Sequence, residues 1–191
     1  GLGYIGTELC KIYSGESWKN QITVIDNRFV SERVNQLRNW SINFVHADIR
    51  DSKNVKQFLN EADVIHHLAG ITDVARTKEE TKPDKDKEMN DVAEKGTSMV
   101  LSESSKNCKI IFPSTHVVFE GKNKMDENIE EDFEKIPVLS YGVGKDKNEE
   151  QIKKSNKNYI ILRLASVYGY STDTMRLNIM PNLFSKIASQ N

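Results

Sequence analysis

The chain has 191 residues, of which 37% are hydrophobic and 29% are charged, and its formal net charge is −1. This length and balance are typical of one globular domain with a buried core. Because the sequence has neither a basic stripe nor a long apolar span, we expect no nucleic-acid partner and no membrane partner. Cys10 and Cys108 lack metal-ligand and redox spacing, so we expect reduced core thiols, a cytoplasmic protein and no metal site.

The chain opens on a glycine pattern that is typical of dinucleotide-binding turns. Gly1, Gly3 and Gly6 form Gly-x-Gly-x-x-Gly around Tyr4 and Ile5, and an apolar-periodic segment follows. Such glycines allow close backbone approach to a pyrophosphate, which the N-terminus of the next helix then receives. The pattern normally follows a strand. Since no strand precedes Gly1, we expect a fragment that lacks the first strand of its sheet and also a C-terminal substrate segment.

Asp26 predicts which dinucleotide binds. The short apolar run 21–26 ends in this carboxylate, 20 residues after Gly6. An acid in this place accepts hydrogen bonds from an adenosine ribose and repels a 2′-phosphate. The sequence therefore favours NAD over NADP, although Arg28, close behind, leaves room for NADP.

Helical and strand-like segments alternate along the whole chain. We predict helices over 4–14, 30–38, 53–60, 85–106, 141–155 and 177–189, and strands over 21–26, 42–46, 63–68, 109–113 and 158–163. This alternation predicts parallel βαβ units with helices on both faces of the sheet. We therefore expect one doubly wound, Rossmann-type α/β domain over 1–191. Two charge-rich stretches, 78–95 and 122–135, are interpreted as solvated surface, although the second could instead flank a substrate.

Tyr141 and Lys145 lie four residues apart, which places them one turn apart on one face of a helix. A free Tyr titrates near pH ~10, so it accepts protons poorly at neutrality unless a nearby cation favours its phenolate form. Lys145 would supply that cation. The same spacing is common on solvated helices, so its meaning depends on the motifs elsewhere in the chain.

Taken together, the motifs resemble those of a known family. The chain is similar to the extended short-chain dehydrogenases/reductases of the NAD-dependent epimerase/dehydratase family, and its cofactor motifs closely resemble those of UDP-glucose 4-epimerases. The resemblance runs over all 191 residues, in the family's order. Its motifs occupy residues 1–6, 24–27, 46–51, 64–70, 112–119, 141–145 and 162–169.

The resemblance implies a set of residues that bind the cofactor NAD. The set comprises the glycine turn that binds the phosphates, the acidic residue that binds the ribose together with the residue after it, and two residues that flank the adenine. It also includes a strand end beneath the cofactor and the Tyr/Lys pair. These are Gly1, Gly3, Tyr4, Ile5 and Gly6; Asp26 and Asn27; Asp48 and Ile49; Leu68, Ala69 and Gly70; and Tyr141 and Lys145.

The resemblance also implies a catalytic set of Thr115, Tyr141 and Lys145. Tyr141 would take the proton of a substrate hydroxyl while a hydride leaves the carbon for the nicotinamide, and Thr115 would orient that hydroxyl. Lys145 would favour the phenolate of Tyr141 and hold the nicotinamide ribose. Members of the family are often dimers that pair the helices matching 85–106 and 141–155, so we expect a homodimer.

Several departures narrow the expected activity. Where the family carries an Asn, this chain has Ala93, and Asn90 is out of register. Sugar 4,6-dehydratases of the family carry Asp-Glu directly after the catalytic Thr, whereas this chain has His116 and Val117. Dehydration is therefore disfavoured.

The leading hypothesis is an NAD-dependent epimerase or oxidoreductase that works on a nucleotide sugar by reversible hydride transfer at a secondary alcohol. One alternative is a dehydrogenase or reductase that works on a non-sugar alcohol or ketone. Another is a dinucleotide-binding protein of the same fold without turnover. The intact set of Thr115, Tyr141 and Lys145 argues against the last alternative, since a sensor does not need it.

Overall fold

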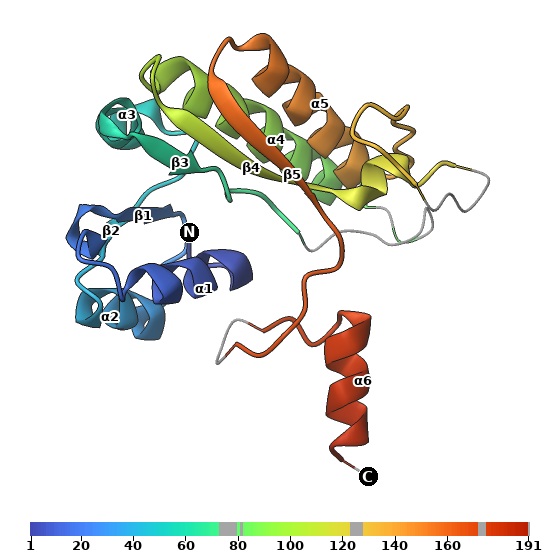
Figure 1. The fold of residues 1–191 in the computed structure, drawn as a ribbon, viewed down its shortest axis with the longest axis horizontal. Helices are drawn as coiled ribbons and strands as arrows, with labels where there is room; N and C mark the ends of the chain where they lie inside the picture. The colour runs from blue at the N-terminus through green and yellow to red at the C-terminus, as the bar shows by residue number, and fades with distance from the viewer. Residues whose placement is uncertain (73–79, 81, 123–127, 172–174, 191) are drawn as a thin grey trace. The chain divides into compact units, whose positions relative to one another are not determined.

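The computed structural model describes residues 1–72, 80, 82–122, 128–171 and 175–190. They form parallel strands that alternate with helices (Figure 1), which confirms the parallel α/β class expected from the sequence. Contacts divide the chain into two compact units. One is Gly1–Val55 together with Ala165–Asn191, and the other is Lys56–Leu164. The charge-rich stretches 78–95 and 122–135 lie partly outside the described residues.

The first unit contains a two-stranded parallel sheet. Strand β1 (Thr23–Asp26) pairs with β2 (Asn43–His46), so that Asp26 and His46 end the two strands side by side. Helix α1 (Tyr4–Tyr13) precedes β1, and α2 (Ser31–Asn39) joins the two strands. Apolar side chains from these elements and their connections bury one another in a common core: Leu2, Cys10, Val24, Val34, Leu37 and Ile42.

Helix α6 (Met180–Ala188) also belongs to the first unit. The sequence predicted that it starts near residue 177, but Ile179 is still extended and the helix begins at Met180. Pro181 explains the difference, because proline favours the first turn of a helix and not its interior.

The second unit contains a three-stranded parallel sheet in the order β3-β4-β5. Helix α3 (Ser52–Glu61), within which the boundary between the units falls, leads into β3 (Val64–His66). Strand β4 (Lys109–Thr115) is central, and β5 (Asn158–Leu164) pairs with it along its whole length. In β4 the side chains of Ile110, Phe112 and Ser114 are buried and alternate with less buried residues, as expected for a strand covered more completely on one face.

Two long helices cover that face of the three-stranded sheet (Figure 1). Helix α4 (Pro83–Glu103) starts with a proline in its first turn, followed by Asp84 and Asp86, which suit the positive end of the helix dipole. It buries one stripe of residues: Met89, Val92, Gly96, Thr97 and Val100. Helix α5 (Ser140–Lys154) packs beside α4, and its buried residues include Gly142, Gly144 and Ile152.

Most element boundaries differ from the prediction by a few residues, and β4 shows why. The prediction ended this strand at Pro113, a residue that lacks the N–H with which a strand in the middle of a sheet would pair. The structure continues to Thr115, since β3 pairs with β4 only as far as Ile111 and Pro113 has a strand on one side only. Two short 3-10 helices, η1 (Lys19–Gln21) and η3 (His116–Phe119), were not predicted.

Candidate active site

The glycine turn and the start of α1 form the first part of the site. Helix α1 begins directly after Gly3. Gly3 is the N-cap residue, and it has no side chain that could accept a hydrogen bond from the backbone N–H groups of the first turn. A Cβ atom at Gly6 would lie 1.9 Å from the carbonyl oxygen of Gly1, so only glycine allows this close approach. Tyr4 and Ile5 occupy the first helical turn. Backbone N–H groups at such an end are suited to an anion.

Asp26 lies beside that turn, at the carboxyl end of β1. Its Oδ2 accepts hydrogen bonds from the Leu2 N–H at 2.7 Å and the Gly1 nitrogen at 2.9 Å. Its Oδ1 accepts a bond from the N–H of Arg28 at 2.9 Å. The carboxylate is therefore fixed next to the glycine turn, and its role in binding the ribose stays a prediction.

Asp48 and Ile49 follow the end of β2, in the same unit as Asp26. Asp48 accepts hydrogen bonds from Arg50, at 2.9 Å from its Nε and 2.7 Å from its Nη2, and one at 3.5 Å from the amide of Asn27. The bonded Arg50 guanidinium lowers the pKa of Asp48 to about 2. Arg50 was not among the predicted site residues. Its place two residues after Asp48 is the feature of the sequence that could have identified it.

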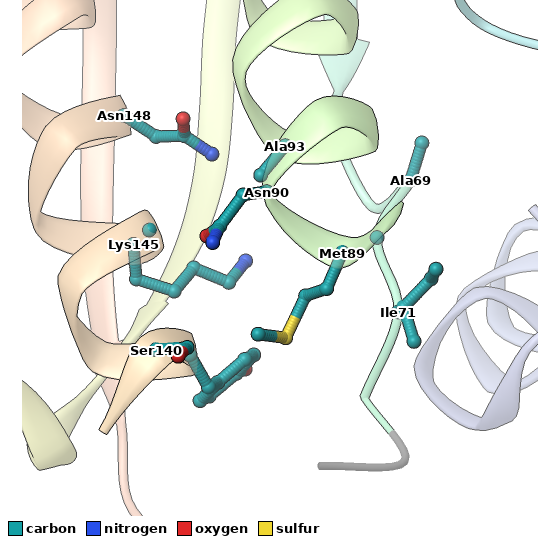
Figure 2. Close-up of a pocket in the computed structure, with 11 residues that line it drawn as sticks. Ala69, Ile71, Met89, Asn90, Ala93, Ser140, Lys145 and Asn148 are labelled. Carbon is teal, nitrogen blue, oxygen red and sulfur yellow. The ribbon is translucent and has the colours of Figure 1, made fainter. Parts of the chain in front are cut away.

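In the second unit, a small pocket that is open to solvent lies between the segment after β3 and helices α4 and α5 (Figure 2). Predicted residues from two elements line it: Ala69, Gly70, Tyr141 and Lys145. Leu68 lies just before these, with its N–H bonded to the carbonyl of His66 at 2.9 Å, and does not line the pocket. The structure thus brings the Tyr/Lys pair and the β3 strand end to one cavity.

Lys145 is the best-defined group in the pocket. Its Nζ donates a hydrogen bond to the Pro113 carbonyl at 2.8 Å and lies 4.4 Å from the centre of the Phe112 ring. The same nitrogen is 5.9 Å from the ring centre of Tyr141. Burial lowers the pKa of Lys145 to about 8, and the carboxylate of Glu149 partly opposes that effect.

Thr115 ends β4, two residues after the carbonyl that holds Lys145. Its side chain is buried, and its Oγ1 accepts a hydrogen bond from the Val117 N–H at 3.3 Å. It does not line the pocket. The first turn of α5 nevertheless lies close to this strand end, because a Cβ atom at Gly142 would be 3.1 Å from the carbonyl oxygen of Val117.

Two carboxamides in the pocket were not predicted as site residues. Asn148 is only 3% exposed, and it points with Asn90 and Lys145 into the space between α4 and α5 (Figure 2). Within the described part of the chain, neither amide makes a hydrogen bond. Asn148 lies three residues after Lys145, so helical spacing from the Tyr/Lys pair could have found it.

His67 lies behind this pocket as a packed histidine. It is buried, its Nε2 is 2.9 Å from the Thr97 hydroxyl, and its ring lies against Phe112. Burial lowers its pKa to about 3, so the ring is neutral at physiological pH. Among the residues that the structure describes there is no cluster of potential metal ligands. No helix in the described ranges is long and apolar enough to span a membrane.

Comparisons with known proteins agree with this geometry. Residues 1–189 match the family described as the RmlD substrate binding domain. A curated relative, the probable low-salt glycan biosynthesis reductase Agl14 of Haloferax volcanii, is 33% identical over 133 residues, which are 69% of this chain and 42% of that protein.

Solved structures give the same fold. UDP-glucuronic acid 4-epimerase from Bacillus cereus, solved with UDP-glucuronic acid and NAD, aligns with a TM-score of 0.76 and 24% identity over 99% of this chain and 61% of its own. UDP-glucose 4-epimerase from Thermotoga maritima, solved with UDP-glucose, aligns with a TM-score of 0.73 and 23% identity over 91% and 56%.

The chain thus spans about 60% of the length of these epimerase structures and less than half of the curated reductase. At identities below 25%, the structural likeness confirms the Rossmann-type fold. The match over nearly the whole chain goes further. The chain belongs to the RmlD substrate binding domain family.

Proposed function

We propose that this chain carries the cofactor-binding and catalytic part of an NAD-dependent enzyme that epimerises, oxidises or reduces a nucleotide sugar by reversible hydride transfer at a secondary alcohol. The observation that carries the proposal is the pocket in which Tyr141 and a buried Lys145 meet the strand end Ala69–Gly70. Family membership supports it, as do the NAD and UDP-sugar in the Bacillus cereus structure.

In this proposal each residue has a chemical role. Tyr141 as phenolate removes the hydroxyl proton, and Thr115 orients the hydroxyl by hydrogen bonding. Lys145 as ammonium favours the phenolate and holds the nicotinamide ribose. When bound, NAD supplies the hydride acceptor. In an epimerase the hydride returns to the sugar molecule that donated it. In a reductase the substrate accepts a hydride and a proton that it did not itself donate.

The epimerase is the leading candidate, and the reductase is favoured by the curated Haloferax volcanii relative. A reductase acting on a non-sugar ketone is the remaining enzyme alternative. We further propose that the glycine turn, Asp26, Asn27, Asp48 and Ile49 hold the adenosine end of NAD. The expected homodimer and cytoplasmic location stay predictions.

Tyr141→Phe in the natural full-length polypeptide tests the catalytic role. The variant should lose turnover by about 100-fold or more, because the acid–base group is gone. NAD affinity should remain within about threefold, since a ring of the same shape is kept. Tyr159→Phe, on partly exposed β5, is the matched control and should be unchanged. Normal turnover with Phe at position 141 would favour a dinucleotide-binding protein without this chemistry.

Asp26 should set the choice of cofactor. Calorimetric titration should give at least tenfold tighter binding of NAD than of NADP, a difference of about 1.4 kcal/mol. Asp26→Ser should narrow that gap, because the charge that repels the 2′-phosphate is removed. Asp63→Asn, an exposed acid in the other unit, is the control. Equal binding of both cofactors by the unaltered protein would overturn this assignment.

A further inference from the structure

Glu149 is a buried carboxylate that the proposed chemistry does not use. It lies on α5 one turn after Lys145 and is 0% exposed. Its Oε1 accepts hydrogen bonds from the Ser114 hydroxyl at 2.5 Å and from the Arg163 Nε at 3.0 Å. Its Oε2 accepts a second bond from Arg163, from Nη2 at 2.9 Å. The carboxylate thus ties together α5, β4 and β5 just before the strand ends.

The same carboxylate also anchors the chain that leads into α5. Lys135 lies 3.3 Å from Oε2 of Glu149 and bonds to Asp146 and Glu150 as well. The Arg163 Nη1 donates a hydrogen bond to the Glu131 carbonyl at 2.7 Å. The prediction of solvated surface is therefore wrong for Lys135, whose side chain is only 15% exposed because three carboxylates hold it.

We propose that Glu149 is a positioning residue for the catalytic set, holding the β4 end that carries Thr115 and the helix that carries Tyr141 and Lys145 in one arrangement. The inference rests on the proposed function of that set. Ser114 directly precedes Thr115, so its bond to Glu149 fixes the strand end at the residue before the catalytic hydroxyl. Separating a buried carboxylate from its cationic partners is costly, so these bonds resist movement of α5 relative to the two strands.

Glu149 also acts on the charge of Lys145. Among the residues that the structure describes, the other groups placed near that ammonium carry no formal charge: the Pro113 carbonyl and Phe112 ring of β4, the ring of Tyr141, the buried neutral His67, and Met89 and Asn90 of α4. Glu149 supplies the negative charge that raises the pKa of Lys145 against the effect of burial. Removing this charge should let Lys145 lose its proton at lower pH.

Glu149→Gln in the natural full-length polypeptide is the test, with Glu150→Gln as the matched control. Both changes remove one carboxylate from adjacent positions, but the Glu150 side chain is 44% exposed and pairs with Lys135 and Lys153. Glu149→Gln should lower kcat about tenfold or more, because small displacements of reacting groups are costly. NAD affinity should stay within about threefold. The alkaline limb of the pH profile should move to lower pH. Glu150→Gln should change none of the three.

The pH profile separates positioning from a purely structural role. If Glu149→Gln lowers kcat but leaves the alkaline limb in place, or behaves like Glu150→Gln, the inference is wrong. Should Glu149→Gln fail to fold, Ser114→Ala removes the strand-end bond while leaving the Arg163–Glu149 pair, and unchanged kcat in that variant overturns the inference. Tyr141→Phe tests the proposed function separately from the role of Glu149. If that variant is active, the proposed function fails; if it is inactive while Glu149→Gln is normal, only the role of Glu149 fails.

Discussion

At the scale of single residues, Lys145 gives the sharpest expectation about pH. Burial lowers its pKa to about 8, so the ammonium is present below that pH and is lost as pH rises through it. Because the proposed chemistry needs the cation beside Tyr141, kcat/KM for the nucleotide sugar, measured with NAD present, should fall above about pH 8. A steady-state pH profile measures this.

Lys145→Arg and Lys145→Met distinguish charge from shape at this position. Arginine stays charged at all accessible pH values, so the alkaline limb should disappear, even if the rate drops because the guanidinium fits the Pro113 carbonyl less well. Methionine keeps the apolar stem and should lose about 100-fold in rate. An alkaline limb that persists near pH 8 with arginine would show that another group titrates there.

At the residue scale, the sequence indicates which side chains lie together only where they are close in the chain, and the roles assigned to them stay predictions. Tyr141 and Lys145 lie in one pocket because four residues make about one helical turn, which the sequence shows directly. Asn90 and Asn148 were missed because they enter the pocket from two helices that are distant in sequence. Glu149 was missed because its partners Ser114 and Arg163 are set by the register of β4 and β5, which spacing alone does not reveal.

At the scale of elements, the alternation of helical and strand-like segments in the sequence predicted the order of strands and helices. The residues at which the strands end depend instead on how the strands pair in the folded chain. The end of β4 at Thr115 follows from the length of β5, not from its own sequence. The short helices η1 and η3 lack the periodicity that marks longer elements, so the sequence gives little sign of them.

Gly121 provides a test of how the segment before α5 is held. Its N–H bonds to the Ile136 carbonyl at 2.8 Å, and a Cβ atom there would lie 2.7 Å from that oxygen and 2.6 Å from the Ile136 Cγ2. Gly121→Ala should therefore displace Ile136 and destabilise the protein by about 1–3 kcal/mol. Gly15→Ala is the control, since its Cβ would be 3.7 Å from the nearest atom. Thermal melting measures both, and equal melting temperatures would show that the segment adapts freely.

At the scale of the whole molecule, the predicted cofactor residues divide between the two compact units. The glycine turn, Asp26 and Asp48 belong to the first, whereas Tyr141 and Lys145 belong to the second. No single stretch of the sequence contains the complete set.

Acid stability is a second property of the whole chain, because carboxylates in both units contribute to it. The pKa of Asp48 is lowered to about 2, chiefly by its bonds to Arg50, and that of Glu149 is lowered, with bonds from Arg163 and Ser114 outweighing the opposing effect of burial. A carboxylate whose folded pKa lies below its unfolded value contributes stability above the unfolded pKa of about 4. That contribution is lost as pH falls through the folded pKa.

The melting temperature should therefore decline from about pH 4 downward, toward pH 2. Thermal melts at intervals between pH 7 and pH 2 measure this decline, with about 2–4 °C expected for each kcal/mol lost. Asp48→Asn and Glu149→Gln should each melt lower at pH 7 and show a shallower decline, because part of the acid-sensitive contribution is already gone. Glu61→Gln, at the exposed end of α3, should keep the full slope. Parallel slopes in all three variants would place the acid sensitivity in other carboxylates.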